Sequence, residues 1–167
     1  MVFGGCNNEM KDSASDKFVL NNTECKRNSD CEMDLFKTTK FFLSFENQNC
    51  TDYITEKFWR SLAYDMIPIV LTPNKEYYSK IAPPDSFIHA SDFDYDTVRL
   101  AEYLHKVSND IDLFSKYFEW KREHEALYKD RILEQFRICE LCYRLNTQNT
   151  MTYYPSISNW FNQQCKR

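Results

Sequence analysis

Three short runs of apolar residues, separated by amphipathic segments, constrain the fold of this chain more than any other feature. The runs are residues 41–45, 67–71 and 86–90, and they carry few polar side chains on either face. Runs that are apolar on both faces are typical of buried strands in a parallel sheet. We therefore expect parallel strands with helices packed against them.

The segments between and after these runs carry helical patterns. In the segment 55–65 and its flanks, one apolar stripe recurs every four residues: Ile54, Phe58, Leu62 and Met66. Asp52 or Thr55 is a suitable cap for this helix. Further helices are predicted at 74–81, 96–107, 110–125, 130–145 and around 157–164. This order predicts the α/β class, with a Rossmann-like parallel sheet and flanking helices.

The length of 167 residues is that of one domain. The predicted organisation has a cysteine-containing N-terminal segment and loop at 1–37, the Rossmann-like domain at 38–145 and a C-terminal tail at 146–167. Residues 7–34 follow neither a helical nor a strand period, so they are predicted to form a long loop held by disulfides.

Charge and glycine content exclude several ways of binding phosphate. The 21 Lys and Arg against 25 Asp and Glu leave a net charge of −4, with no basic tract, which argues against nucleic-acid binding. Gly4 and Gly5 are the only glycines, so a glycine-rich phosphate loop is excluded. A phosphate site in this chain has to use side chains and a helix N-terminus.

Cysteines and glycosylation sequons indicate the secretory pathway. The chain has seven cysteines and two sequons, at Asn21 and Asn49. The alternative is that the thiols are free and the sequons are chance matches. No signal peptide and no apolar stretch long enough for a membrane span is visible, so we expect a piece of a longer protein or a truncated gene model. The disulfide candidates are Cys6, Cys25, Cys31, Cys50, Cys139 and Cys142.

The spacing of Cys139 and Cys142 has three interpretations. A redox-active pair normally opens a helix after a strand, whereas this pair lies late in a helical pattern. A zinc site needs two more nearby ligands, and the chain has three histidines, His89, His105 and His124. A structural disulfide, formed with each other or with cysteines of another domain, is favoured. His89 lies in an apolar run and is interpreted as a packed structural histidine.

A polar loop follows the first predicted strand and leads into the first helix. Tyr53, Glu56, Lys57 and Arg60 then fall on one helix face. A carboxylate can accept hydrogen bonds from a ribose diol, and an ammonium at a helix N-terminus suits a diphosphate. An aromatic ring can pack on a sugar or a base. The alternative is an ordinary surface pair between Glu56 and Arg60, with Lys57 solvated.

Two sequence blocks in this region resemble a known family. The blocks are F-L-S-F-E-N at 42–47 and D-Y-I-T-E-K-F at 52–58, and they are similar to the signature of the α1,3/1,4-fucosyltransferases. The similarity covers roughly residues 38–145 and includes the Cys139–Cys142 spacing. The start of the chain, F-G-G-C at 3–6, is also similar to a segment of that family.

The resemblance implies the C-terminal, donor-binding domain of an inverting glycosyltransferase with GT-B architecture. Such an enzyme moves L-fucose from GDP-β-L-fucose to an N-acetylglucosamine of a glycoprotein N-glycan. By resemblance, Glu56 holds the ribose hydroxyls and Lys57 the diphosphate, while Asn47 and Tyr53 line the donor pocket. Phe42 stands where members often have tyrosine, so the contact of that hydroxyl is lost. No metal site is predicted and no cofactor is required.

The resemblance also limits what these residues are expected to do. The general base of the family belongs to an N-terminal domain, so no catalytic residue is assigned here and the chain alone is expected to be inactive. Its expected partners are GDP-fucose and a glycoprotein acceptor, its compartment is the Golgi lumen, and its membrane anchor lies outside the chain. The alternatives are a donor-binding pseudoenzyme without transfer activity and a secreted interaction domain without nucleotide affinity.

Overall fold

The computed structural model describes residue 25 and residues 29–128, 131–148, 150 and 153–166. The predicted disulfide residue Cys6 and the predicted glycosylation residue Asn21 lie outside the described residues. The chain divides into two compact units between Thr39 and Lys40, and each is described by itself.

The first unit contains helix α1 (Asp30–Thr38), so the loop predicted up to residue 34 is wrong from Asp30 onward. The hydroxyl of Ser29 accepts a hydrogen bond from the backbone N–H of Glu32 at 3.3 Å and caps the helix. Serine followed three residues later by glutamate is a capping-box pattern, and it marks this helix start where apolar spacing does not. Cys25 forms a disulfide with Cys31 in the first turn.

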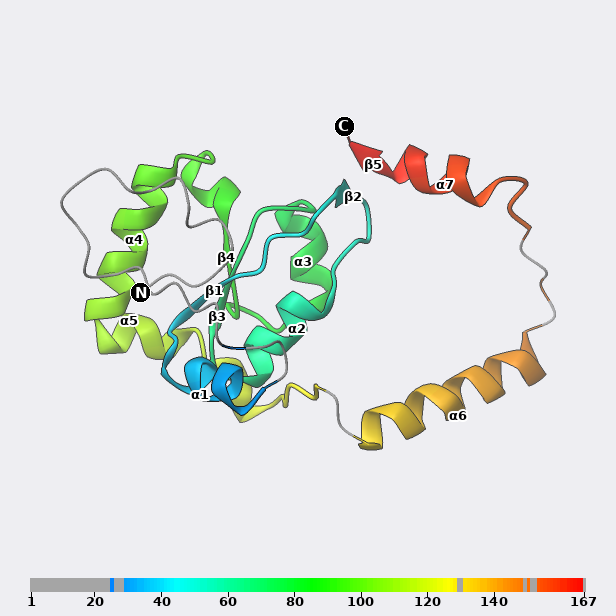
Figure 1. Ribbon diagram of the computed structural model, residues 1–167, viewed down its shortest axis with the longest axis horizontal. Coiled ribbons are helices and arrows are strands. Elements are labelled where there is room, and N and C mark those ends of the chain that lie inside the picture. The colour runs from blue at the N-terminus through cyan, green and yellow to red at the C-terminus, as the bar shows by residue number, and fades with distance from the viewer. Residues whose placement is uncertain (1–24, 26–28, 129–130, 149, 151–152, 167) are drawn as a thin grey trace. The chain divides into compact units, whose positions relative to one another are not determined.

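The second unit is built on a parallel sheet in the order β1 (Phe41–Leu43), β3 (Ile67–Val70), β4 (Ile88–His89) (Figure 1). Phe41 lies opposite Ile67 and Val70 lies opposite His89. Each strand is shorter than its apolar run, but β3, which lies in the centre, is buried along its whole length. The predicted α/β fold with a Rossmann-like parallel sheet and flanking helices is confirmed.

The helices of the second unit agree with the predicted segments except at one place. They are α2 (Glu56–Ala63), α3 (Lys75–Ile81), α4 (Thr97–Asn109), α5 (Ile111–Lys116), α6 (Arg131–Thr147) and α7 (Ile157–Gln164). The helix predicted at 110–125 is wrong beyond Lys116, because Phe118 packs on one face of the sheet and Trp120 on the other. A short 3-10 turn, η2 (Glu119–Arg122), carries the chain between these positions.

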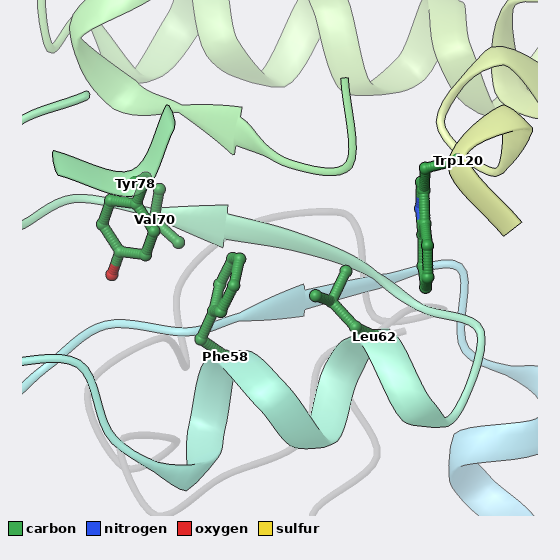
Figure 2. Packing of buried hydrophobic residues seen from close by; sticks show 5 residues of the cluster. All are labelled: Phe58, Leu62, Val70, Tyr78 and Trp120. Carbon is green, nitrogen blue, oxygen red and sulfur yellow. The ribbon is translucent and has the colours of Figure 1, made fainter. Parts of the chain in front are cut away.

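Helices cover both faces of the sheet, because successive residues of β3 point to opposite sides. Val70 packs against α2 and α3 in a cluster formed by Phe58, Leu62, Val70, Tyr78 and Trp120 (Figure 2). The side chains of Ile67 and Ile69 pack on the other face, in a cluster that includes residues of α4 and α5. The apolar stripe predicted for α2 therefore faces the core through Phe58 and Leu62.

A second, antiparallel pair of short strands was not predicted. It joins β2 (Asn49–Cys50) to β5 (Cys165–Lys166), and Cys50 and Cys165 lie opposite each other and form a disulfide. The pairing brings the segment after α7 against the polar loop that follows β1. Over the described ranges, no helix has the length and apolar character needed to cross a membrane.

Replacing Tyr78 by phenylalanine is expected to lower the free energy of unfolding by about 1 kcal/mol. The ring is fully buried, and its hydroxyl donates a hydrogen bond to the carbonyl oxygen of Thr72 at 3.0 Å. Burial, followed by the nearby charge of Glu46, raises the pKa of this hydroxyl above its usual value, so it remains a donor. Urea unfolding measures the loss.

The matched control for this prediction is Tyr95→Phe, because Tyr95 is 59% exposed. Its expected effect is within about 0.5 kcal/mol. Equal unfolding midpoints for Tyr78→Phe and Tyr95→Phe would contradict a stabilising role for the buried hydroxyl.

Candidate functional site

The candidate site lies where the parallel strands end. The loop 44–55 joins the carboxyl end of β1 to the N-terminus of α2, and the loop 71–74 joins β3 to α3. His89 closes β4 at the same edge. Ligands of open parallel sheets bind along this edge, where loops and helix N-termini gather.

Glu46 is a fully buried carboxylate in the loop after β1, with a side chain that is 0% exposed. One of its oxygens, Oε1, accepts a hydrogen bond from the backbone N–H of Thr55 at 2.7 Å. The hydroxyl of Thr55 lies 2.9 Å from Oε2 and 3.0 Å from Oε1. Glu46 therefore ties the start of the loop to Thr55, the N-cap residue of α2.

Lys57 lies in the first turn of α2 and forms an ion pair with Glu46. Its ammonium lies 2.9 Å from Oε2 of Glu46 and also donates to the hydroxyl oxygen of Thr55 at 3.2 Å. The Lys57 side chain is 25% exposed. An ammonium has three N–H donors, so these contacts use two of them and leave the third for a ligand.

The predicted donor-binding residues lie on consecutive segments at this edge. Phe42 is on β1, Asn47 and Tyr53 are on the loop, and Glu56 and Lys57 open α2. Asn47 is exposed and the other four are half-buried. Lys57 contacts Glu46, to which the sequence analysis gave no role, and Thr55, which it named only as a candidate helix cap. The roles predicted for the five residues remain predictions.

The spacing of Arg60 placed it on the polar face of the helix, but the structure buries this residue. The residue is only 8% exposed, and its guanidinium lies over the ring of Phe42 with its central carbon 5.4 Å from the ring centroid. The solvent-exposed position that the surface-pair alternative gave to Arg60 is therefore wrong. The helix begins at Glu56, so Tyr53 precedes it, and the hydroxyl of the N-cap residue Thr55 bonds to Glu46 instead of to the helix backbone.

His89 is a packed structural histidine, as predicted. It is fully buried, and its Nε2 lies 2.9 Å from the carbonyl oxygen of Pro73. Its Nδ1 accepts a hydrogen bond from the backbone N–H of Ser91 at 3.1 Å. Because Nδ1 is an acceptor, Nε2 carries the proton and donates to Pro73. The Nε2 bond joins β4 to the loop before α3, and the Nδ1 bond holds the turn that directly follows β4.

A polar cavity of about 200 Å³ lies beside this edge, between α3 and the β2–β5 pair. Its lining residues are Asn49, Thr51, Pro73, Asn74, Glu76, Tyr77, Lys80 and Gln164. Burial, and then a hydrogen bond to Asp52, raises the pKa of the Tyr77 hydroxyl. None of the five predicted donor-binding residues lines the cavity, whereas the sequon residue Asn49 does. Glycosylation of Asn49 remains a prediction.

The cysteines follow the disulfide prediction in part. Cys25, Cys31 and Cys50 are bonded, and the partner of Cys50 is Cys165, which was not among the predicted disulfide residues. Cys139 and Cys142 are exposed free thiols on α6, so a disulfide between these two is not present. In the part of the chain that the structure describes, no cluster of histidine, cysteine or acidic side chains is arranged to hold a metal ion.

Glu46 and Cys165 are the residues at this edge that sequence reasoning did not assign, and Thr55 was assigned only as a helix cap. Glu46 gives the clearest signal, because an acidic side chain directly follows a buried apolar run at 41–45. Polar side chains in that position lie at the ligand-binding edge of a parallel sheet.

Comparison with known proteins agrees with the fold. The model of glycosyltransferase family 10 (fucosyltransferase), C-terminal part, matches residues 1–160. The chain is 36% identical over 131 residues to the 4-galactosyl-N-acetylglucosaminide 3-alpha-L-fucosyltransferase FUT5 of Hylobates lar, covering 78% of this chain and 34% of that protein. It is 35% identical over 130 residues to the 3-galactosyl-N-acetylglucosaminide 4-alpha-L-fucosyltransferase FUT3 of Homo sapiens, covering 77% and 35%.

A third relative comes from a nematode. The alpha-(1,3)-fucosyltransferase fut-6 of Caenorhabditis elegans is 34% identical over 156 residues, which cover 92% of this chain and 36% of that protein. The chain thus spans about a third of the length of the curated relatives that it matches. The chain belongs to glycosyltransferase family 10, the fucosyltransferases, and corresponds to the C-terminal part of that family.

Proposed function

We propose that the chain is the GDP-fucose-binding part of an α1,3-fucosyltransferase that transfers L-fucose to an N-acetylglucosamine of a glycoprotein N-glycan. The observation that carries the proposal is the ammonium of Lys57, fixed at the N-terminus of α2 on the ligand-binding edge of the sheet. The names of the relatives support the reaction, since they describe 3-alpha and 4-alpha transfer of L-fucose to galactosyl-N-acetylglucosaminides.

The chemistry fits the residues at this edge. In an inverting transfer, an acceptor hydroxyl attacks the anomeric carbon of fucose, the bond to the diphosphate breaks, and GDP leaves with the bonding electrons. The charge that develops on the diphosphate is stabilised by Lys57 and by the positive end of α2. Glu56 accepts hydrogen bonds from the ribose hydroxyls, Asn47 and Tyr53 line the donor pocket, and Phe42 packs beside Arg60.

The acceptor proton requires a general base. The base belongs to an N-terminal domain of the full-length enzyme, so the 167-residue chain binds donor without transferring fucose. The full-length enzyme acts in the Golgi lumen, held there by a membrane anchor outside this chain, and requires no divalent metal for donor binding. Turnover of GDP-fucose and an N-glycan acceptor by the purified chain alone would contradict this division of labour.

Replacing Lys57 by alanine is expected to weaken binding of GDP by about tenfold or more, because a charge-assisted hydrogen bond to the diphosphate is lost. Calorimetric titration of the oxidised chain with GDP and with GDP-fucose measures the change. Glu56→Ala is expected to weaken the same two ligands and also guanosine, which carries the ribose diol without the phosphates.

Lys75→Ala is the matched control for Lys57→Ala. Lys75 also lies in the first turn of a helix and is also paired with a carboxylate, Asp92, at 2.6 Å. This variant is expected to change the GDP dissociation constant by less than about twofold. Equal losses in the two lysine variants, or no binding by the unmodified chain, would count against the proposal.

A further inference from the structure

Glu46 presents an electrostatic problem for a site that receives a diphosphate. Its buried carboxylate pairs with Lys57, and so offsets the positive charge that attracts an anion. Burying a carboxylate is costly unless hydrogen bonds and an opposite charge compensate it. Here the compensation comes from Thr55 and Lys57. A site selected for positive charge alone would not place this carboxylate here, so the contribution of Glu46 has to be geometric.

The geometry at Glu46 fixes one flexible side chain and one loop end together. The ammonium of Lys57 stands on a four-carbon stem with many rotamers, and its contacts with Glu46 and Thr55 restrict it to one position. The backbone of Lys57 is fixed as well, because Ser44 donates a hydrogen bond from its hydroxyl to the Lys57 carbonyl oxygen at 3.2 Å. The third N–H of the ammonium is thereby directed away from both partners.

We infer that Glu46 is a positioning residue for recognition of the donor diphosphate, acting through Lys57 and Thr55. The inference rests on the proposed function, because it assumes that the ligand of Lys57 is a nucleoside diphosphate. Glu46 does not contact the ligand. It holds the ammonium before the ligand arrives, so that binding does not have to order the lysine side chain.

The substitution Glu46→Gln separates positioning from charge, because the two effects have opposite signs. Glutamine keeps the shape and one acceptor oxygen but removes the negative charge. If Glu46 only offset charge, its removal would strengthen GDP binding. If Glu46 positions Lys57, the variant weakens GDP binding by about fivefold and leaves guanosine within about twofold. Stronger GDP binding, or equal losses for GDP and guanosine, would overturn the inference.

A double-variant cycle tests whether Glu46 acts through Lys57. In Glu46→Gln/Lys57→Ala, the GDP dissociation constant is expected to match that of Lys57→Ala within about twofold, since the residue being positioned is already gone. Additive losses would overturn the inference. If Glu46→Gln does not fold, as judged by circular dichroism, Thr55→Val takes its place. This variant removes the hydroxyl between the two charged groups, and it is expected to weaken GDP binding by about threefold without affecting guanosine.

A readout without any nucleotide keeps this inference separate from the proposed function. Acetylation by acetic anhydride requires the Lys57 amine to leave Glu46 and Thr55, so its rate reports how firmly the amine is held. In Thr55→Val, which removes a contact of the amine without removing a charge, the rate at Lys57 is expected to rise by about threefold, with Lys75 unchanged as the internal control. If the unmodified chain fails to bind GDP, the proposed function falls and the acetylation rate still decides the role of Glu46. An unchanged acetylation rate at Lys57 would overturn the inference that Glu46 positions this side chain.

Discussion

Replacing Phe58 by alanine is expected to lower the free energy of unfolding by about 3–5 kcal/mol. The residue is fully buried on α2, with ring centroids 5.0 Å from Tyr78 and 6.1 Å from Phe87. Figure 2 shows its ring between α2 and β3, in the cluster with Leu62 and Val70. Truncation leaves a cavity where helix and sheet meet, and close-packed surroundings collapse only partly into such a space.

Urea unfolding followed by circular dichroism measures this loss, with Phe136→Ala as the matched control. Phe136 is also on a helix, α6, but it is 67% exposed, so its truncation is expected to change stability by less than about 0.5 kcal/mol. Because Phe58 directly follows Lys57, the same substitution loosens the first turn of α2 on the sheet. A loss below about 1 kcal/mol would contradict the central position of Phe58 in this core.

The parallel sheet could be predicted because its strands are apolar on both faces. Ile67, Ile69 and Val70 face two different clusters of the core, so no polar residue interrupts the run. The helices α2, α3 and α4 could be predicted for a related reason, since each has polar flanks and an apolar side that faces one cluster. Element ends were less accurate, as expected where capping decides them.

Packing on the two faces of the sheet determines where the helix in the segment 110–125 ends, which helical spacing predicted wrongly. Phe114, Tyr117 and Phe118 pack on one face, and Trp120 belongs to the cluster on the other. A continuous helix cannot deliver Phe118 and Trp120 to opposite faces of a sheet. Local spacing contains no information about this change of face. The sequence therefore predicted a helix at 110–125, whereas α5 ends at Lys116.

The candidate site was predicted in location more than in contacts. The polar loop after the first strand and the lysine at the helix start follow from the general arrangement of parallel sheets. The burial of Glu46 and Arg60 could not be predicted in this way, because a motif gives the order of residues and not their exposure. The pairing of β2 with β5 left no local signal either, since each strand has two residues.

Replacing Cys165 by serine is expected to lower the free energy of unfolding by about 2–4 kcal/mol. The disulfide joins Cys50 to a residue 115 positions later, and the chain between them contains β3, β4 and most of the core. Removing it lets the unfolded chain explore many more conformations, and this gain grows with the length of the closed loop. Urea unfolding under oxidising conditions measures the difference from the unmodified chain.

Cys142→Ser is the matched control, because Cys142 is an exposed free thiol and its replacement is expected to change stability by less than about 0.5 kcal/mol.

Amide hydrogen exchange adds a local test of the same disulfide. The backbone N–H of Thr51 donates to the carbonyl oxygen of Gln164 at 2.8 Å, so its exchange is expected to quicken by about tenfold in Cys165→Ser. The N–H of Ser44, which donates to Ile69 in the sheet, reports only the global loss. Equal stability of Cys165→Ser and Cys142→Ser would contradict the proposal that the Cys50–Cys165 disulfide stabilises the fold by restricting the unfolded chain. Unchanged exchange at Thr51 would mean that backbone pairing alone holds β5 against β2 and keeps that wall of the cavity in place.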